Sequence, residues 1–522
     1  MLHKTQFFSE KDGKKKPVRL KNTSGVFGAP AIYYALFISI LLFNIARGFF
    51  YIYNDSFNPD EFQHMHIVWN IVQNKIIYKD FFEHHGPLFP ILTSIIYKSF
   101  HYQPVFETLY LLRLNSFILV ILILLLTFYI THALTKSVLW GLFSAALLSS
   151  TYFFISRGIQ IRPDSLQSVF FLCGVYSFLK FLERKNTTPL FYSGVFLACS
   201  ILTSAKAGFG LAGVVIFLIV NPLLKEGLMK YGKIYFIFLA GLIVPFSMAL
   251  AYFYYHGALT PYLYYNFCFN FWGLSHRKSL TTFRLMTTIT EGQFCIFIII
   301  LAGIIALVYS LGYLRALRRY DERLLFIALM VFTTSIMVII ILYAQTVISV
   351  SPMACIGSTY GFYSISIYKE KLLSHKMRKT IQSLGAVALL STSLNNLLII
   401  RDIPDSVSDQ RALTNYILEA TPRSEPIQFF WNGCGGYMFN EDTQFYWTNV
   451  GNFQRIFNKN EQYEVFGSHL IDTLEREHVR YVVASENNID DLPALPLTLR
   501  AYLYQNFQPT QFGCLLQRKN ND

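Results

Sequence analysis

The chain has 522 residues, of which 53% are hydrophobic, 17% aromatic and only 14% charged, and its mean hydropathy is +0.38. Soluble globular chains carry about 25% charged residues, so this composition excludes an ordinary soluble domain and indicates a membrane protein. The formal net charge of +13 does not indicate nucleic-acid binding, because the basic residues stand in short runs between apolar segments. The seven cysteines are scattered and match neither a zinc motif nor a disulfide framework.

About eleven apolar segments approach the length of roughly 20 residues that an α-helix needs to cross a bilayer. The first is too long for the apolar part of a cleavable signal peptide, so we interpret it as a signal anchor. The sequence therefore predicts a polytopic α-helical membrane protein. The predicted spans are residues 31–53, 111–133, 138–156, 166–182, 189–204, 207–223, 234–255, 294–314, 324–343, 346–367 and 381–400.

Short basic runs predict the side of the membrane on which each loop lies. They precede the first, fifth, seventh, ninth and eleventh spans, which places all of them on one side, and that side is cytoplasmic. Residues 1–30 are thus predicted to be a basic cytoplasmic N-terminus, and residues 31–400 the transmembrane domain. Residues 401–522 contain more Gly, Pro and acidic residues and only strand-length apolar runs, so we expect a small extracytoplasmic α/β domain there.

The first outer loop, residues 54–110, is rich in acids and histidines for so hydrophobic a chain. Asn58 and the proline after it form a strong helix start, with Asp60 and Glu61 in the first turn. Apolar residues then recur at spacings of three and four over residues 62–76, which predicts a helix lying along the membrane surface. The two acids have two interpretations: they stabilise a helix N-terminus, or they are catalytic.

A second polar group follows in the same loop. Asp80 is either a cap for the next turn or a substrate ligand, and Glu83 stands directly before two histidines. The spacing of the loop's histidines fits no structural zinc site, so we interpret them as hydrogen-bonding residues in a wet cleft. No bound metal is predicted with certainty, and a divalent cation, where one binds, is expected on Asp60 and Glu61. These histidines are His64, His66, His84 and His85.

Some cations fall on the predicted outer side, where the positive-inside rule does not place them. Arg162 stands in a tight connection between two spans, and Lys206 ends an apolar span, where an ammonium is costly unless it is paired. An anionic head group would explain both. The alternatives are an ordinary loop cation and, for Lys206, a side chain reaching toward lipid head groups. Asp164, after a proline, is either catalytic or only the start of the next helix.

The residues of the first loop resemble a known family, the GT-C glycosyltransferases. They are similar to bacterial relatives of the dolichyl-phosphate-mannose protein mannosyltransferases and to the aminoarabinose lipid A transferase. The resemblance covers roughly residues 30–370; in its segment 345–354, Thr346 stands where Tyr is usual. The matching positions are the acidic pair at 60–61, then Tyr78, Asp80, Phe81, Phe82, His85, Gly86, Pro87 and Leu88, the segment Ile161–Asp164, and the span Gly194–Lys206.

The resemblance implies an inverting sugar transfer outside the membrane. A polyprenyl-phosphate sugar would be the donor, and a glycan, lipid A or a protein the acceptor, with membrane lipids as further partners and no nucleotide in the site. Asp60 would act as general base on the acceptor hydroxyl, assisted by Glu61 or Asp164. Lys206 and Arg162 would hold the phosphate. The remaining candidates for substrate binding are Asp80, His85, His276 and Arg277.

Two other functions are open at this level. A transporter or flippase of lipid-linked sugar would use similar cations, but it predicts repeat symmetry, and no repeat is visible. A non-catalytic membrane scaffold would have no need of so many acids at the outer surface. The expected location is a bacterial inner membrane, with the C-terminal domain in the periplasm; an endoplasmic-reticulum membrane would give the same topology.

Overall fold

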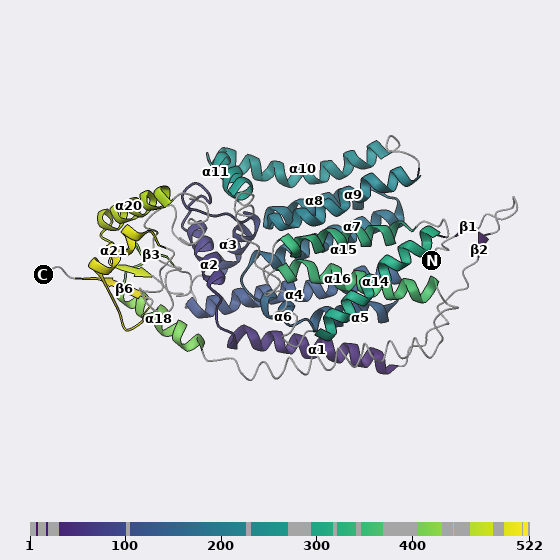
Figure 1. Cartoon of the computed structure of the whole chain (residues 1–522), viewed down its shortest axis with the longest axis horizontal. Coiled ribbons are helices and arrows are strands. Elements are labelled where there is room, and N and C mark those ends of the chain that lie inside the picture. Colours follow the sequence, from purple (N-terminus) through teal and green to yellow (C-terminus); the bar gives the residue numbers. More distant parts are fainter. Residues whose placement is uncertain are drawn as a thin grey trace.

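The structure, a computed structural model, has a bundle of long helices with a smaller unit of helices and strands at one end (Figure 1). Near the N-terminus, two short strands, β1 (Phe7–Phe8) and β2 (Pro17–Val18), pair antiparallel. The residues that the structure describes are 7–8, 17–18, 31–100, 105–225, 231–269, 294–316, 321–340, 346–368, 406–430, 442, 460–483, 495–513 and 515–519.

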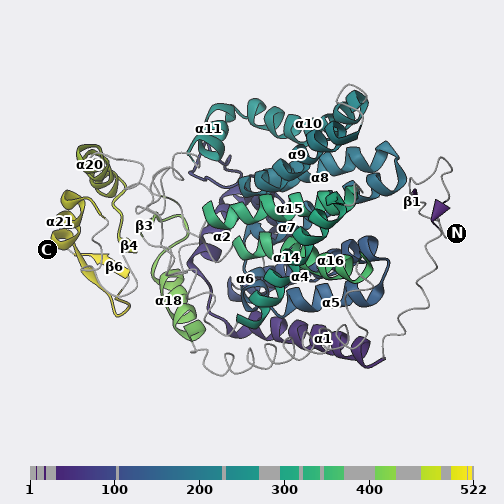
Figure 2. The ribbon, with the colours of Figure 1, turned by 45° about the vertical axis from the view of Figure 1, so that its right-hand side comes forward.

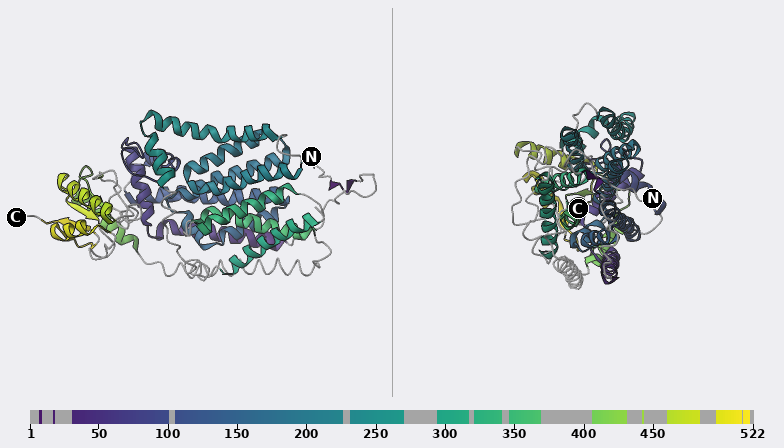
Figure 3. Two further views of the ribbon diagram at one scale, coloured as in Figure 1. Left: turned by 45° about the horizontal axis from the view of Figure 1, so that its top comes forward. Right: turned by 90° about the vertical axis from the view of Figure 1, so that its right-hand side faces the viewer.

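The long helices of the bundle lie side by side with roughly parallel axes (Figures 1 and 3). Among the described residues, six helical segments are long and apolar enough to cross a membrane, and the chain is a multi-pass membrane protein. The bundle helices are α1 (Ala31–Asn54), α4 (Val105–Thr135), α5 (Val138–Ser149), α6 (Tyr152–Gly158), α7 (Pro163–Arg184), α8 (Thr187–Thr203), α9 (Gly208–Lys225), α10 (Gly232–Tyr255), α14 (Phe294–Ala316), α15 (Glu322–Ile340) and α16 (Thr346–Tyr368).

The bundle confirms the predicted polytopic helical fold and corrects one of its spans. The span predicted at 138–156 is broken into α5 and α6, where the Ser149 and Ser150 hydroxyls donate to the carbonyl of Ala146 at 2.9 and 2.8 Å. Such side-chain bonds compete with the helical ladder. The predicted span 381–400 lies outside the described residues. The cytoplasmic and outer sides stay predictions, as do the domain boundaries.

Two short helices, α2 (Pro59–Val72) and α3 (Leu88–Phe100), lie at one end of the bundle and run across its long helices (Figures 1 and 3). Helix α2 begins as predicted: the Asn58 side chain accepts from the Asp60 N–H at 3.0 Å, and Glu61 accepts from the Asn58 N–H at 2.8 Å. Its position along the membrane surface stays a prediction, but its polar side does not face solvent, because His66 and Asn70 are buried as deeply as the apolar side.

The C-terminal unit contains a four-stranded sheet in the order β3-β4-β6-β5. Strand β3 is parallel to β4, and the other neighbours are antiparallel. The strands are β3 (Gln428–Phe429), β4 (Tyr481–Val483), β5 (Phe507–Pro509) and β6 (Leu515–Arg518), with the helices α18 (Ser406–Ala420), α20 (Asn460–Arg476) and α21 (Leu497–Asn506) around them. In Figure 2, the helices α20 and α21 lie farthest from the long bundle helices, whereas α18 lies next to them.

The C-terminal unit is docked on the segment around α2. One apolar core contains Phe62 of α2 together with Leu413 and Val482 of the C-terminal unit. Asp442 binds two α2 side chains: its Oδ1 lies 2.6 Å from His66 Nε2, and its Oδ2 accepts from Asn70 Nδ2 at 2.9 Å. These contacts cover the polar side of α2, which the sequence pattern would have left to water.

Candidate active site

Asp60 stands at the second position of α2 and faces a cation from another element. Its carboxylate pairs with the guanidinium of Arg162, 102 positions along the chain. The Asp60 side chain is 38% exposed, whereas that of Arg162 is 9% exposed. The cap on Asn58 is made by the Asp60 backbone N–H, so the Asp60 carboxylate is not needed to start the helix. It remains open to solvent and available for chemistry.

Arg162 also contacts a second acid, which in turn binds a second cation. Its Nε donates to Asp164 Oδ2 at 3.4 Å, and Lys206 Nζ donates to Asp164 Oδ1 at 2.9 Å. The Asp164 side chain is 1% exposed and that of Lys206 is 23% exposed. The four side chains Asp60, Arg162, Asp164 and Lys206 therefore form one continuous chain of alternating charge, which we call the ion chain. Its two ends are exposed, and its centre is buried.

Local structure explains how each member of the ion chain is held. Arg162 is the N-cap of α7 and Asp164 stands in its first turn, where a carboxylate is favoured by the helix dipole. The turn before α7 is fixed by Ser165, whose hydroxyl donates to the Gly158 carbonyl at 2.8 Å. Lys206 lies in a 3-10 turn, η2 (Ala205–Ala207), which joins α8 to α9. The sequence predicted all four as site residues but not their order of pairing.

The charges around Asp60 keep it ionised. Burial alone would raise the pKa of this carboxyl, but the charge and hydrogen bond of Arg162 lower the pKa below its ordinary value of 3.8. His64 and His85 act in the same direction with smaller effects. Asp60 is thus a carboxylate at neutral pH, which is the form that accepts a proton.

Glu61 has a different environment, and its predicted catalytic role does not fit it. Arg113 of α4 donates to both oxygens of Glu61, from Nε to Oε1 at 2.9 Å and from Nη2 to Oε2 at 2.6 Å. The Ile161 N–H donates to Oε1 at 3.1 Å. Both side chains of the pair are 0% exposed. Glu61 is therefore a buried positioning residue that joins α2 to α4 and to the turn before α7.

Arg113 is the residue that the sequence analysis missed. Besides Glu61, it binds the carbonyls of Ile52, Asp55 and Ser56 at 3.2, 2.7 and 2.8 Å. It thereby fixes the connection from α1 to α2, which carries Asp60 at its end. The sequence did indicate a role for Arg113, because an arginine inside an apolar span is energetically costly and indicates a buried partner.

Asp80 and the two candidates in the later loop do not join the ion chain. Asp80 is exposed, and its carboxylate accepts from the Ile76 N–H at 2.6 Å, which caps a turn. This contact is of the turn-capping kind that the sequence left open for Asp80, and substrate binding by Asp80 stays a prediction. His276 and Arg277 lie outside the described residues.

His85 lies close to α2 and contacts Glu83. The oxygen Glu83 Oε1 accepts from the backbone N–H groups of His84 and His85 at 2.7 and 2.6 Å, and it lies 2.5 Å from His85 Nδ1. The Tyr78 hydroxyl donates to the His85 carbonyl at 2.5 Å. Gly86 packs so closely on α8 that an added Cβ would lie 2.2 Å from the Leu202 carbonyl oxygen. This loop therefore has little freedom to move.

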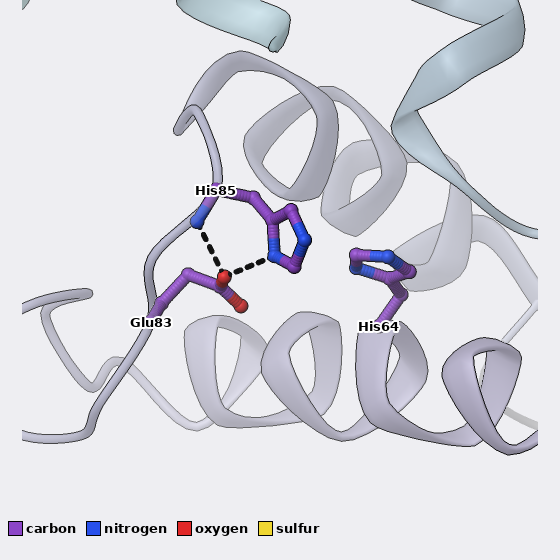
Figure 4. Close-up of side chains that lie close together, drawn as sticks. All are labelled: His64, Glu83 and His85. Carbon is purple, nitrogen blue, oxygen red and sulfur yellow. Dashed lines mark hydrogen bonds and ion pairs between the residues drawn. The ribbon is translucent and has the colours of Figure 1, made fainter. Parts of the chain in front are cut away.

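The histidine on α2 completes a small group of metal-ligating residues. The side chains of His64, Glu83 and His85 each place a donor atom within 4.8 Å of the others (Figure 4). Burial, followed by the charge on His85, lowers the pKa of His64 to about 3. Burial would raise the pKa of Glu83, but the neighbouring His85 holds it well below its ordinary value. Asp60 and Glu61, expected to hold any cation, instead face two different arginines.

Lys206, the last member of the ion chain, lines a pocket. Lys206 lines it together with Gln167, Phe171 and Ser349. Gln167 is itself fixed, because its Oε1 accepts from the Ser349 hydroxyl at 2.5 Å and its Nε2 donates to Ser200 at 3.3 Å. The pocket beside Lys206 is therefore lined by both apolar and polar side chains.

In comparison with known proteins, part of the chain matches a family model and most of it is similar in fold to solved structures. The family model described as dolichyl-phosphate-mannose-protein mannosyltransferase matches residues 84–252. No curated protein matches the chain.

Two solved structures share the fold over most of the chain. The archaeal oligosaccharyltransferase AglB from Archaeoglobus fulgidus, in complex with an inhibitory peptide and a dolichol-phosphate, is 13% identical with a TM-score of 0.56, over 94% of this chain and 74% of that one. ArnT from Cupriavidus metallidurans in the apo state is 12% identical with a TM-score of 0.53, over 82% of this chain and 91% of that one.

A third structure matches over a shorter stretch. It is the Saccharomyces cerevisiae protein O-mannosyltransferase Pmt1-Pmt2 complex bound to the sugar donor, with 18% identity and a TM-score of 0.38. The match covers 50% of this chain and 39% of the yeast chain, so this chain spans well under two thirds of that relative.

Proposed function

We propose that the chain is a membrane glycosyltransferase of the GT-C fold, similar to the protein mannosyltransferases and to ArnT, and that it transfers a sugar from a polyprenyl-phosphate donor. The acceptor is a glycan, a lipid or a protein, and the transfer inverts the anomeric centre. The family match and the bound dolichol-phosphate of the archaeal relative support the donor class. The proposal rests above all on one observation, the ion chain that runs from Asp60 to Lys206.

Asp60 is the general base in this proposal. Displacement at an anomeric carbon requires removal of the proton from the attacking hydroxyl on the face opposite the leaving phosphate. Asp60 is the exposed acid of the ion chain, and it is ionised at neutral pH. Asp164 is buried and holds both cations of the chain, so it assists by positioning them. Its own carboxylate is not accessible to an acceptor.

Lys206 and Arg162 bind the donor phosphate. The leaving phosphate gains charge as the glycosidic bond breaks, and fixed cations stabilise that charge. Lys206 carries the more exposed of the two cationic groups and lines the pocket with Phe171 and Ser349. A phosphate at Lys206 would leave its polyprenyl chain near the apolar part of that wall.

The reaction takes place on the outer face of the membrane in this proposal. The distribution of basic runs in the sequence supports a cytoplasmic N-terminus, which places α2 and the C-terminal unit outside. In a bacterium, that side is the periplasmic side of the inner membrane.

The test is transfer from a radiolabelled polyprenyl-phosphate sugar pool in membranes that contain the wild type or the Asp60→Asn variant at matched levels. Asparagine retains the helix start but does not accept a proton. Asp472→Asn, at an exposed acid of α20, is the matched control. We expect transfer by the wild type and the control and none by Asp60→Asn. Equal transfer by all three would reduce Asp60 to a structural residue, and no transfer by any of them would reject the donor class.

A further inference from the structure

His64, Glu83 and His85 come together from two separate elements. His64 projects from α2, one turn after Asp60, whereas the other two belong to the loop before α3. Figure 4 shows the two imidazole rings turned toward each other, with the Glu83 carboxylate beside them. The ring centroids of His64 and His85 are 5.0 Å apart. We call these three residues the histidine cluster.

One oxygen of the histidine cluster has no hydrogen-bond partner among the described residues. Glu83 is 1% exposed, and its Oε2 is buried and unsatisfied. His64 is 2% exposed, and its ring lies 5.0 and 5.6 Å from the rings of His85 and Phe89, measured between centroids. A buried polar atom without a partner is destabilising by about 1–3 kcal/mol. The third member, His85, is 28% exposed in its side chain and gives access from solvent.

Within the described residues, the ion pairs of Glu83 are with histidines alone. No lysine or arginine in that part of the chain pairs with it. A buried carboxylate normally requires a paired cation. His85 Nδ1 contacts Glu83 Oε1, which leaves Glu83 Oε2 without a partner among the described residues. A metal ion would satisfy all three side chains at once.

We propose that His64, Glu83 and His85 bind a divalent transition metal of the zinc class. Two imidazoles and one carboxylate form a donor set that suits such an ion and leaves a fourth position open. Ligands on one tetrahedral zinc ion lie about 3.3 Å apart at bond lengths of about 2.0 Å. Donor atoms that are already within 4.8 Å of one another need only small side-chain rotations to reach this geometry.

The site differs from the one that the sequence suggested. A hard cation on Asp60 and Glu61 would have to displace Arg162 and Arg113, whereas the histidine cluster offers its donors without displacing an arginine. The bound ion would tie the loop before α3 to α2, close to the proposed base. It would thus help to fix the position of Asp60. Metal binding can be measured without any sugar transfer.

The experiment is a titration of the full-length chain with Co²⁺, purified in detergent through a tag without histidine and first stripped with a chelator. We expect one equivalent of Co²⁺ to bind with visible absorption bands, and Zn²⁺ to displace it. His64→Ala and Glu83→Gln should weaken binding at least about tenfold. His469→Asn, at an exposed histidine of α20, is the control and should bind as the wild type does.

A second variant separates loss of a ligand from loss of the fold. His64→Cys replaces one ligand by another that transition metals accept, so binding should persist, and a thiolate-to-cobalt charge-transfer band should appear. The proposal is overturned if the wild type binds no Co²⁺. That result is expected if Glu83 and His85 only bind each other. The proposal is equally overturned if His64→Ala and Glu83→Gln bind Co²⁺ with wild-type affinity. Binding of Co²⁺ by His64→Cys without the thiolate-to-cobalt band would also overturn it.

Discussion

Arg113 and Glu61 form a fully buried, bidentate ion pair, with distances of 2.9 and 2.6 Å between their facing atoms. The acid next to it in the sequence, Asp60, is 38% exposed and pairs with a different arginine. Two adjacent carboxylates thus have separate roles, one in holding the helix and the other at the exposed end of the ion chain. The difference arises from position on the helix, because successive residues project in different directions.

Replacing Arg113 by methionine should destabilise the fold strongly. The change leaves the Glu61 carboxylate buried without its cation, and breaking one side of a buried pair costs about 3–5 kcal/mol. The measurement is thermal unfolding of the detergent-purified chain. The double variant Glu61→Gln and Arg113→Met removes the uncompensated charge and should recover part of the loss. A double variant no more stable than the single one would show that Arg113 acts mainly through the carbonyls it binds.

The acid limb of the pH profile of the transfer rate should shift when Arg162 is replaced by glutamine. Arg162 lowers the pKa of Asp60 below 3.8, so in the wild type the base stays ionised until the pH falls through that lowered value. The stability that this pair contributes is present above the unfolded pKa and is lost over the same acidic range. Without Arg162, burial dominates and raises the pKa of Asp60, so the acid limb of the rate profile should shift to higher pH. An unchanged acid limb would mean that another group titrates there.

Replacing Lys206 should lower kcat/KM for the donor more than it affects the KM of the acceptor. Lys206→Met removes a charge-assisted contact worth about 1.5–3 kcal/mol, which corresponds to a loss of about ten- to a hundredfold in kcat/KM for the donor. Lys206→Arg keeps the charge and should recover part of the activity. Steady-state kinetics with the donor varied and the acceptor saturating measures both. A loss confined to the KM of the acceptor would place the phosphate elsewhere.

Features that depend on local sequence could be predicted. The start of α2 follows from Asn58 and the proline after it, and the bundle follows from hydropathy over about 20 residues. The same local reasoning named the members of the ion chain, because acids at helix starts and cations at the ends of apolar spans are unusual. The family match supports the enzyme class that these residues suggested.

Features that depend on long-range packing could not be predicted. Glu61 and Asp60 look equivalent in the sequence, and only Arg113, 52 positions away, distinguishes them. On the polar side of α2, two residues bind Asp442, which lies 372 and 376 positions away in the sequence. The histidine cluster likewise joins residues whose spacing fits no local motif, because the fold and not the spacing brings them together.

Gln410 couples the C-terminal unit to the segment before α2. Its side chain accepts from the Phe57 N–H and donates to the Phe57 carbonyl, both at 2.9 Å. Phe57 is 1% exposed, and its ring lies 3.7 Å from the guanidinium of Arg113. The docked unit therefore supports the arginine that holds Glu61 and so fixes the start of α2.

Gln410→Leu should loosen this connection while keeping the volume of the side chain. The Phe57 N–H and carbonyl would be buried without partners, which costs about 1–3 kcal/mol. We expect faster hydrogen exchange at the Phe57 amide and in the first turn of α2, together with lower transfer activity. Asp409→Asn, at the exposed neighbouring position of α18, is the matched control. Unchanged exchange at Phe57 in Gln410→Leu would show that the apolar core alone holds the C-terminal unit in place.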